Sequence, residues 1–246
     1  MARMLEKALA KWAALPEEAR APREEEPQDA VKKARPEARF PSTGIAIVEY
    51  TRDLPRDDAP KDWRGEAWNI DHLWITGKEA KGLVPIERGV GARRLVPSPI
   101  ARRIAVFHLV DFVRGQTSPN APDNVEKAQI TSEVTSINGD VVHVRLDGSF
   151  RVAAKGRWPV RSDQPLQEQE RGVEGTLLGT AVYDTAAGKL VAIDFVILGK
   201  RWGGTQYNGR ADDLAPSPVG FAFRLAGDTP ADRVAPQFVW SDYWAR

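Results

Sequence analysis

The stretch from Val125 to Ala226 constrains the fold more than any other part of the chain, because its pattern predicts consecutive β-strands joined by short turns. From Val141 to Val152, apolar and polar side chains alternate, which is the period of a strand with one buried face. Just before this run, Asn138-Gly139 is a dipeptide that tolerates the positive φ angles of a tight hairpin turn. We therefore expect an antiparallel hairpin whose first strand runs from Ala128 to Ile137. The polar segment Lys155–Gly172 is expected to be a long loop between strands.

Two further apolar runs lie at the centre of this stretch and are joined by a turn at Asp184–Gly188. The run Leu190–Gly199 is apolar on both faces except at Asp194, which predicts a central strand covered on both sides. A last strand is expected at Val219–Ala226. Short links between such strands favour a meander. The predicted fold class is mainly β: an antiparallel meander that forms a barrel or a strongly curled sheet, with a short N-terminal helix, an extended N-terminal arm and one or two short helices.

Two more strands are predicted upstream, at Gly44–Arg52 and Ala67–Thr76. The second of these ends in a capping box, in which Thr76 and Glu79 satisfy each other's backbone amides at the start of a helix. Ser98-Pro99 predicts another helix start, because serine caps a helix and proline is tolerated in its first turn. We expect this second helix to pass into a strand near Phe107.

The first residues predict a short amphipathic helix, Met4–Leu15, which ends at Pro16 because proline cannot continue the hydrogen-bond ladder. Leu5, Leu9 and Trp12 lie on one stripe of this helix. Acidic and basic residues are mixed on its polar face. The stripe therefore suits docking against a protein surface better than anchoring at a membrane.

Residues 16–41 are rich in charge and proline and poor in large apolar side chains, so this segment cannot form a core of its own. We expect two parts: residues 1–41, an N-terminal helix and extended charged arm, and residues 42–246, a single β-rich domain with an aromatic C-terminal tail. Our hypothesis is that the arm and the tail hold a protein partner or a second copy of the chain. The residues expected to make this contact are Leu5, Leu9, Trp12, Phe40, Trp240, Tyr243 and Trp244.

Composition excludes several classes of function. The 35 basic and 34 acidic residues leave a formal net charge of +1, which gives no electrostatic basis for binding nucleic acid or an anionic membrane. The chain has no cysteine, so disulfides, thiol nucleophiles and cysteine-ligated metals are excluded. No apolar run approaches the ~20 residues needed to span a bilayer. Glycine-rich nucleotide loops and the GxSxG motif are also missing, and we expect no cofactor.

The chain has three histidines, and two of them lie near carboxylates in the sequence. His72 follows Asp71, and His108 precedes Asp111 by three residues. Imidazole and carboxylate groups together bind zinc or non-haem iron, or act as an acid/base pair. The spacings HxH, HxxxH and HExxH do not occur, which favours hydrogen-bonded places in a core or interface. If the chain is an enzyme, His72, His108 and Asp111 are its catalytic candidates, and the two histidines are its metal candidates.

Eight tryptophans are the other chemical resource of the chain. Three of them, Trp63, Trp68 and Trp74, lie close together in the sequence. Four others lie in expected loops or in the tail: Trp158, Trp202, Trp240 and Trp244. Exposed tryptophans would stack on sugars, whereas buried ones would fill a core or an interface, which is the more common use of large aromatic groups. A carbohydrate-binding module therefore stays open as an alternative.

Several segments together carry a family resemblance: KWAALPEEAR at Lys11–Arg20, DHLWIT at Asp71–Thr76, KGLVP at Lys81–Pro85, RRIAVFHLVDFVRG at Arg102–Gly115, YDTAAGKLVAIDFVILGKRWGG at Tyr183–Gly204, PVGFAFRL at Pro218–Leu225 and ADRVAPQ at Ala231–Gln237. In these segments the chain resembles a family of mostly exported bacterial proteins that has no known activity. The resemblance spans nearly the whole chain, which implies one folding unit and export, and it transfers no catalytic residue. In members of the family, the segment on the carboxyl side of an RG-x-x-P motif is longer than in this chain. Here the corresponding loop is RGQTSPNAPDN at Arg114–Asn124.

These observations predict a non-enzymatic binding protein or structural subunit of a larger assembly, anchored through its N-terminal arm and aromatic tail. One alternative is a small-ligand or metal-dependent enzyme that uses the barrel interior, and another is a carbohydrate-binding module that uses the loop tryptophans. The expected location is periplasmic or extracellular. The opening MARMLEKALAKWAAL lacks the apolar core of a signal peptide, so we expect any export signal to be absent from this chain.

Overall fold

The computed structural model describes residues 2–20, 44–87, 89–227, 229 and 232–244, and the chain divides into two units, residues 1–39 and 40–246. In the first unit, α1 (Ala2–Ala13) is followed by α2 (Glu17–Arg20). The predicted N-terminal helix is thus confirmed, and Leu9 and Trp12 are 58% and 54% exposed on it. The side chain of Leu5 and the whole of Phe40 lie outside the described residues.

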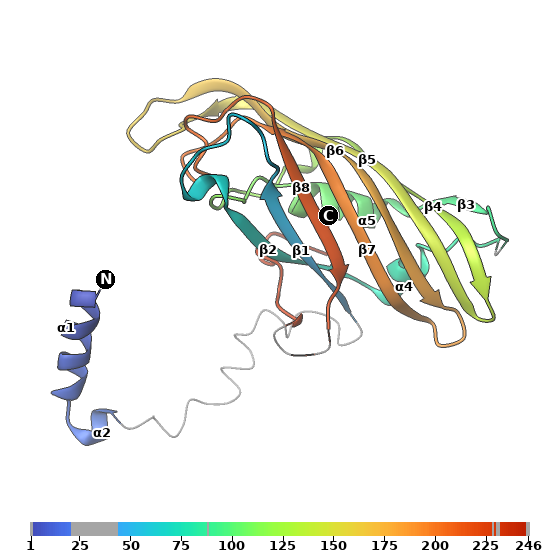
Figure 1. Ribbon diagram of the computed structural model, residues 1–246, viewed down its shortest axis with the longest axis horizontal. Helices are drawn as coiled ribbons and strands as arrows, with labels where there is room; N and C mark the ends of the chain where they lie inside the picture. The colour runs from blue at the N-terminus through green and yellow to red at the C-terminus, as the bar shows by residue number, and fades with distance from the viewer. Residues whose placement is uncertain (1, 21–43, 88, 228, 230–231, 245–246) are drawn as a thin grey trace. The chain divides into compact units, whose positions relative to one another are not determined.

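The second unit is built on one antiparallel sheet of eight strands, in the order β2-β1-β8-β7-β6-β5-β4-β3 (Figure 1). The strands are β1 (Ile45–Asp53), β2 (Trp68–Ile75), β3 (Arg93–Leu95), β4 (Val125–Asn138), β5 (Val141–Trp158), β6 (Gln167–Asp184), β7 (Lys189–Trp202) and β8 (Ser217–Leu225). The predicted class, a mainly β antiparallel meander, is confirmed. The sheet is open, with β2 and β3 at its edges, and is not closed into a barrel.

Short helices lie on one face of the sheet (Figure 1). They are α4 (Gly77–Lys81), α5 (Ser98–Arg103) and the π-helix η3 (Ile104–His108); two 3₁₀ turns, η2 (Trp63–Gly65) and η4 (Pro122–Asn124), are also present. The predicted capping box is confirmed: the Glu79 amide donates to the Thr76 hydroxyl, and the Thr76 amide donates to the Glu79 carboxylate.

The hydrophobic core lies between these helices and the inward side chains of the sheet. In β5, the large apolar residues on one side of the predicted alternation are buried: Val142, Val144, Leu146, Phe150 and Val152. On β7 and β8, the rings of Phe195 and Phe223 stack with their centroids 4.4 Å apart. Full burial of one such side chain contributes ~1.5–3 kcal/mol, so this layer supplies a large share of the stability of the domain.

The ends of β5 and β6 differ from the prediction. The segment Lys155–Gly172 was predicted to be a loop, but β5 continues to Trp158 and β6 begins at Gln167. Cross-strand charge pairs join the two strands here, such as Lys155 Nζ to Glu170 Oε2 at 3.7 Å. Because polar side chains occupy both faces of this extension, the alternation that identifies a half-buried strand is lost.

The strand expected after Phe107 is also wrong, because η3 ends at His108 and residues 109–124 contain no strand. All five residues of η3 are buried, so apolar groups occur without a clear period. The turn between β4 and β5 is shifted by one residue: Asn138 pairs with Val141 and Gly139 has a φ of 59°. Gly139 therefore takes the first central position of the turn, where a type II′ hairpin requires glycine.

The C-terminal tail covers the open edge of β2. The Trp74 amide donates to the Tyr243 hydroxyl at 2.9 Å, and the Trp74 indole donates to the Val234 carbonyl at 2.9 Å. The backbone amide of Gln237 donates to Asp71 Oδ1, also at 2.9 Å. A second apolar cluster forms at this edge from Ala46, Trp74, Val106, Phe107, Val110, Phe112, Phe238 and Tyr243. Covering an edge strand in this way blocks its pairing with another chain.

Candidate functional site

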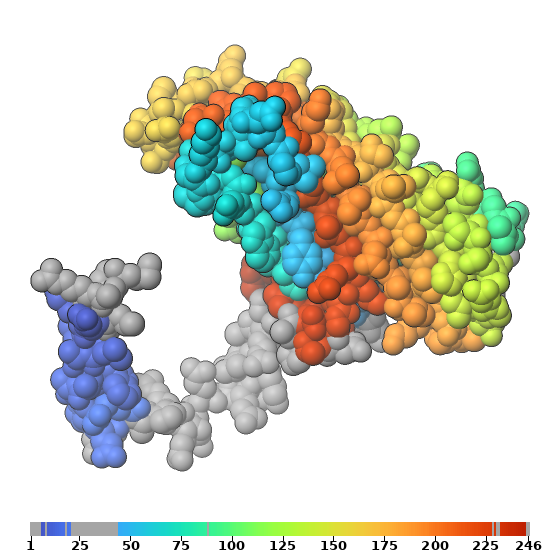
Figure 2. Space-filling view, in the orientation of Figure 1, coloured from blue at the N-terminus to red at the C-terminus, as the bar shows by residue number. Residues whose placement is uncertain are grey.

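The face of the sheet opposite the helices is open in Figure 2, which shows β1, β8 and β7 side by side at the surface. The prediction that β7 is covered on both sides is therefore wrong. Phe195 and Ile197 are buried, but Leu198 is 51% exposed and Val196 is 36% exposed. The largest contiguous apolar patch on the surface of a protein is often a functional surface, such as a site of protein–protein interaction.

Apolar side chains on this face lie next to one another across five strands. In the register of the sheet, Ile70 pairs with Tyr50, Tyr50 with Ala222, Ala222 with Val196, and Val196 with Leu178. A neighbouring row, two residues along each strand, comprises Trp68, Arg52, Gly220, Leu198 and Thr176. The apolar members of both rows, with Leu54, are named the outer apolar band: Tyr50, Leu54, Trp68, Ile70, Leu178, Val196, Leu198 and Ala222.

A trough runs along β8 through the middle of the outer apolar band. Its floor contains Gly220 and Ala222, and its volume is about 460 Å³. Trp68 and Tyr50 rise on one side, with their ring centroids 6.3 Å apart, and Leu198 rises on the other. The trough exists because β8 carries two small residues between strands that carry large ones.

Charged pairs flank the band on both sides. Arg224 is the register partner of Asp194, and its guanidinium lies 5.7 Å from the centre of the Tyr50 ring. On the other flank, Glu174 is the register partner of Lys200. An apolar centre with a polar rim is the usual anatomy of a protein–protein interface.

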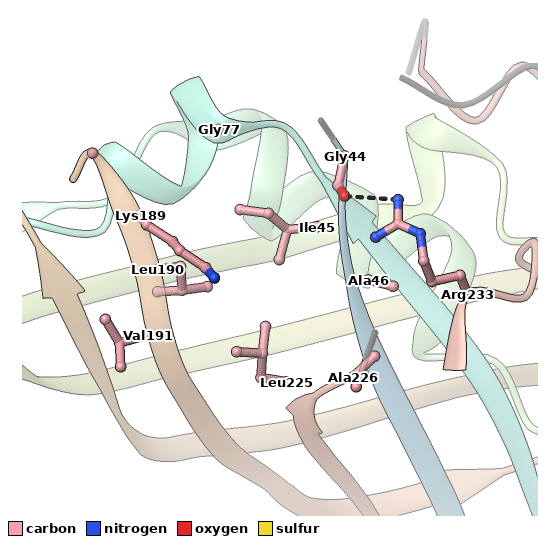
Figure 3. A pocket seen from close by; sticks show the side chains of 12 residues that line it. Gly44, Ile45, Ala46, Gly77, Lys189, Leu190, Val191, Leu225, Ala226 and Arg233 are labelled. Atoms are coloured by element: carbon pink, nitrogen blue, oxygen red, sulfur yellow. Dashed lines mark hydrogen bonds between the residues drawn. The ribbon is translucent and has the colours of Figure 1, made fainter. Parts of the chain in front are cut away.

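A second pocket, of about 580 Å³, opens at the end of the sheet where β1 and β7 begin and β8 ends (Figure 3). Its lining is mainly apolar, with Ile45 and Leu190 among its walls and Lys189 at its margin. Arg233 closes one side and donates to the Gly44 carbonyl at 3.2 Å. His72, His108 and Asp111 do not line this pocket, so it does not contain the predicted catalytic candidates.

The interior of the domain holds a separate polar cluster. Glu49 on β1 and Asp71 on β2 are direct register partners, and both point toward η3. His108, the last residue of η3, places Nδ1 2.6 Å from Glu49 Oε2 and 3.6 Å from Asp71 Oδ2. Its other ring nitrogen, Nε2, lies 2.9 Å from the Tyr243 hydroxyl. All four side chains are buried.

Burial sets the protonation of this cluster. It raises the pKa of Glu49 well above the ordinary value, and the nearby charge of Asp71 raises it further. Burial also raises the pKa of Asp71 to about 7 and lowers the pKa of His108 to about 3. These directions assign the Glu49 proton to the hydrogen bond with His108 Nδ1, and the His108 Nε2 proton to the bond with the Tyr243 oxygen.

A third polar group is an ion network that joins β1, β7 and the long loop between β7 and β8. Its members are Arg56, Arg114, Arg201, Arg210, Asp53, Asp111 and Asp213. Asp213 is central: its carboxylate lies 2.7 Å from Arg56, 2.8 Å from Arg114 and 2.5 Å from Arg201. Such a network fixes the loop against the sheet, and each partner that is removed leaves charges buried without compensation.

The structure separates the three predicted catalytic candidates. Asp111 belongs to the ion network, where its carboxylate lies 2.7 Å from Arg210. His108 is in the buried cluster, and the group of potential metal ligands around it contains Glu49 and Asp71 but not His72. His72 is buried on the edge strand β2. The expectation that His108 has a hydrogen-bonded place in the core is confirmed.

Sequence reasoning missed Glu49, although a signal for it was present. In the strand predicted at Gly44–Arg52, Ile45, Ile47 and Glu49 share one face by period 2, and Ile47 is buried. A carboxylate in line with a buried isoleucine is costly unless it is protonated, paired or bound to a metal. The same reasoning applies to Asp71, which shares a face with the buried Leu73 and Ile75.

The residues predicted to bind a partner have different environments. Trp240 is 61% exposed, whereas Tyr243 is buried within its own chain. The guanidinium of Arg103 lies 4.7 Å from the centre of the Trp244 ring. Of the tryptophans considered for sugar binding, Trp158 and Trp202 are each covered by an arginine, and Trp63 and Trp68 are exposed.

Comparison with protein-family models, with curated proteins and with solved structures gives no match for this chain. Among the described helices, none has the length and apolar character needed to cross a membrane.

Proposed function

We propose that this protein is a non-enzymatic structural subunit that pairs with a second copy of itself through the outer apolar band. The observation that carries the proposal is the register of that band, in which apolar side chains lie side by side across β2, β1, β8, β7 and β6. Two sheets that pack face to face with their apolar sides together are a common solution for burying such a surface.

The size of the band favours a protein surface over a small ligand. Five adjacent strands span ~19 Å at the usual strand spacing, which is wider than a drug-sized molecule requires. The two rows cover an area on the order of 300 Å², well below the ~800 Å² that each partner of a stable complex buries. The band would thus form the apolar centre of an interface whose rim is polar.

The surface shape of the outer apolar band supports a second copy of the chain as its binding partner. In a twofold pair, each surface patch meets the same patch of the other copy, so a ridge must lie beside a trough that can receive it. Trp68 and Tyr50 form such a ridge, and the floor at Gly220 and Ala222 forms the trough. Each flank also carries one cation and one anion, Arg224 with Asp194 and Lys200 with Glu174, which allows opposite charges to meet across a twofold axis.

The proposal of a non-enzymatic role rests on the position of the titratable groups. Glu49 and His108 are completely buried, so a substrate arriving from solvent does not reach them. The exposed outer apolar band offers shape and apolar surface but no acid/base pair. The exposed stripe of α1, with Leu9 and Trp12, stays a predicted partner-binding element.

The first test is the oligomeric state measured by analytical ultracentrifugation over a wide range of protein concentration. The wild-type chain is expected to be a dimer, and Leu198→Glu is expected to be a monomer because a charge in the centre of the band cannot be desolvated. Val191→Glu is the matched control, since Val191 is half exposed on the same strand but outside the band. A monomeric wild type would reject the proposal, and dimers of both variants would place the interface elsewhere.

A disulfide trap tests the geometry directly, because the native chain contains no cysteine. Trp68 and Ala222 lie on strands separated by β1, at ~10 Å, which is too far for a disulfide within one chain. The double variant Trp68→Cys/Ala222→Cys is therefore expected to give a cross-linked dimer on oxidation, whereas each single variant is not. Failure of the double variant to cross-link while the wild type is dimeric would reject this packing of the two bands.

A further inference from the structure

Two carboxylates and one imidazole meet in the interior of the domain without enough hydrogen-bond donors. Glu49 and His108 are 0% exposed and Asp71 is 3% exposed. Among the described residues, Glu49 Oε1 and Asp71 Oδ2 are completely buried and have no hydrogen-bond partner. A buried acceptor without a donor is destabilising, so two of them beside one imidazole indicate a place that suits a cation.

We propose that Glu49, Asp71 and His108 bind a divalent transition-metal ion in the core of the domain. One potential ligand atom from each side chain lies within 4.8 Å of the others. Ligands at ~2.1 Å from one tetrahedral ion lie ~3.4 Å apart, so on binding the widest separation in the cluster closes by up to ~1.4 Å. The 2.6 Å separation of His108 Nδ1 and Glu49 Oε2 opens at the same time. The fixed register of Glu49 and Asp71 on paired strands holds two of the three ligands in place.

Charge balance supports a divalent cation. Glu49 and Asp71 are cross-strand neighbours, and two like charges in that position repel each other. A doubly charged cation between two carboxylates gives a site of zero net charge, which removes both the repulsion and most of the cost of burying the ionised groups.

The surrounding hydrogen bonds already orient the ligands. The Tyr243 hydroxyl lies 2.9 Å from His108 Nε2 and leaves Nδ1 directed toward the carboxylates. The backbone amide of Gln237 donates to Asp71 Oδ1, and Asp71 Oδ2 has no hydrogen-bond partner among the described residues. Metal-binding histidines and carboxylates are held by outer partners of this kind in most metal sites.

The donor set narrows the identity of the ion. One imidazole nitrogen with carboxylate oxygens suits Zn²⁺, Mn²⁺, Fe²⁺ or Co²⁺. Ca²⁺ requires six to eight oxygen ligands, and Mg²⁺ retains most of its waters, so neither fits a dry site with one nitrogen. Since the ligands come from β1, β2 and η3, the ion would join the edge of the sheet to the helical layer.

The experiment uses Zn²⁺, Mn²⁺ and Co²⁺ as probes, each present while the full chain refolds from denaturant, because the site is closed in the folded domain. We expect one ion per chain by elemental analysis after dialysis, a Co²⁺ absorption spectrum in the visible range, and an increase in Tm that depends on metal concentration. Asp71→Asn and His108→Gln are expected to lose the stoichiometric ion and the Tm shift.

Two matched variants serve as controls: Asp163→Asn changes an exposed carboxylate, and His143→Gln changes a histidine outside the cluster. Both are expected to retain the ion. Asp71→Asn keeps the shape of the side chain and removes one of two repelling acids, so its metal-free form should fold even if His108→Gln does not. The proposal is overturned if the refolded wild type holds less than one ion per chain and its Tm does not change with any probe, or if the Asp71→Asn variant binds as the wild type does. These outcomes do not depend on the oligomeric state.

Discussion

The hydroxyl of Tyr243 lies 2.9 Å from the backbone nitrogen of Trp74 and 2.9 Å from Nε2 of His108. One side chain of the C-terminal tail thus contacts both the edge strand β2 and the end of the helix η3. The tail is thereby part of the folded core, although it follows the last strand by nearly twenty residues of sequence. Two buried donors, the Trp74 amide and Nε2 of His108, depend on this single oxygen, which makes the hydroxyl a sensitive point for mutation.

Tyr243→Phe is expected to lower the free energy of unfolding by ~1–3 kcal/mol, because it removes a buried hydrogen-bond partner while preserving the ring. Urea denaturation followed by circular dichroism measures the difference. Tyr207→Phe is the control, since Tyr207 is 67% exposed and its substitution should change stability by less than ~0.5 kcal/mol. Equal stability of the two variants would show that the tail hydroxyl is not required for stability.

Two adjacent aspartates of the loop between β7 and β8 provide a second comparison. The side chain of Asp213 is 7% exposed within the ion network, whereas that of Asp212 is 51% exposed and pairs with Arg64. Asp213→Asn is expected to cost ~3–5 kcal/mol because it leaves buried arginines without their partner. Asp212→Asn is expected to cost at most ~1 kcal/mol. Denaturation midpoints that differ little would contradict the assignment of a structural role to the network.

The same network predicts a loss of stability in acid. Burial alone would raise the pKa values of Asp53 and Asp213, but hydrogen bonds and charges from the arginines outweigh it and lower both pKa values below the ordinary 3.8. A carboxyl group with a lowered pKa in the folded state contributes its full stabilisation above the unfolded-state pKa, and this contribution declines as the pH falls below that value. The stability difference between wild type and Asp213→Asn should therefore shrink as the pH is lowered from about 5 to about 3. A difference that stays constant over this range would refute the assignment.

Much of the sheet could be predicted from the sequence because its strands alternate over a half-buried face. The alternation Val142, Val144, Leu146 and Phe150 has the same period in the sequence and in the folded strand. The alternation within single strands cannot show whether the two edge strands of the sheet meet to form a barrel. Closure of a barrel depends on the curvature summed over all eight strands. Nor can the alternation show which apolar face is covered: Leu198 and Ile197 are equally apolar, but only Ile197 lies in the core.

The buried cluster could be predicted only in part, because its members come from four separate segments. His108 was identified as a candidate by residue type, and its proximity to Asp111 in the sequence suggested the wrong partner. The actual partner, Glu49, is 59 residues away and meets His108 through the packing of η3 on the sheet. Proximity in the sequence indicates a shared site only within one element, whereas this site is formed by tertiary structure.

Glycines in the sheet lead to a last prediction, in which the same substitution has opposite effects at two positions. Gly175 and Gly199 are register partners on β6 and β7, and a Cβ added at Gly199 would lie 1.8 Å from the Glu174 carbonyl oxygen and 2.6 Å from Gly175 Cα. These contacts are with backbone atoms that cannot rotate away, so Gly199→Ala is expected to cost at least ~2 kcal/mol through displacement of the strands. At Gly77, in the first turn of α4, a Cβ meets no atom within 4 Å, so Gly77→Ala should leave stability unchanged or raise it by up to ~1 kcal/mol. Thermal unfolding of the two variants beside the wild type measures both effects, and a Gly199→Ala variant as stable as Gly77→Ala would show that β6 and β7 do not approach as closely as described.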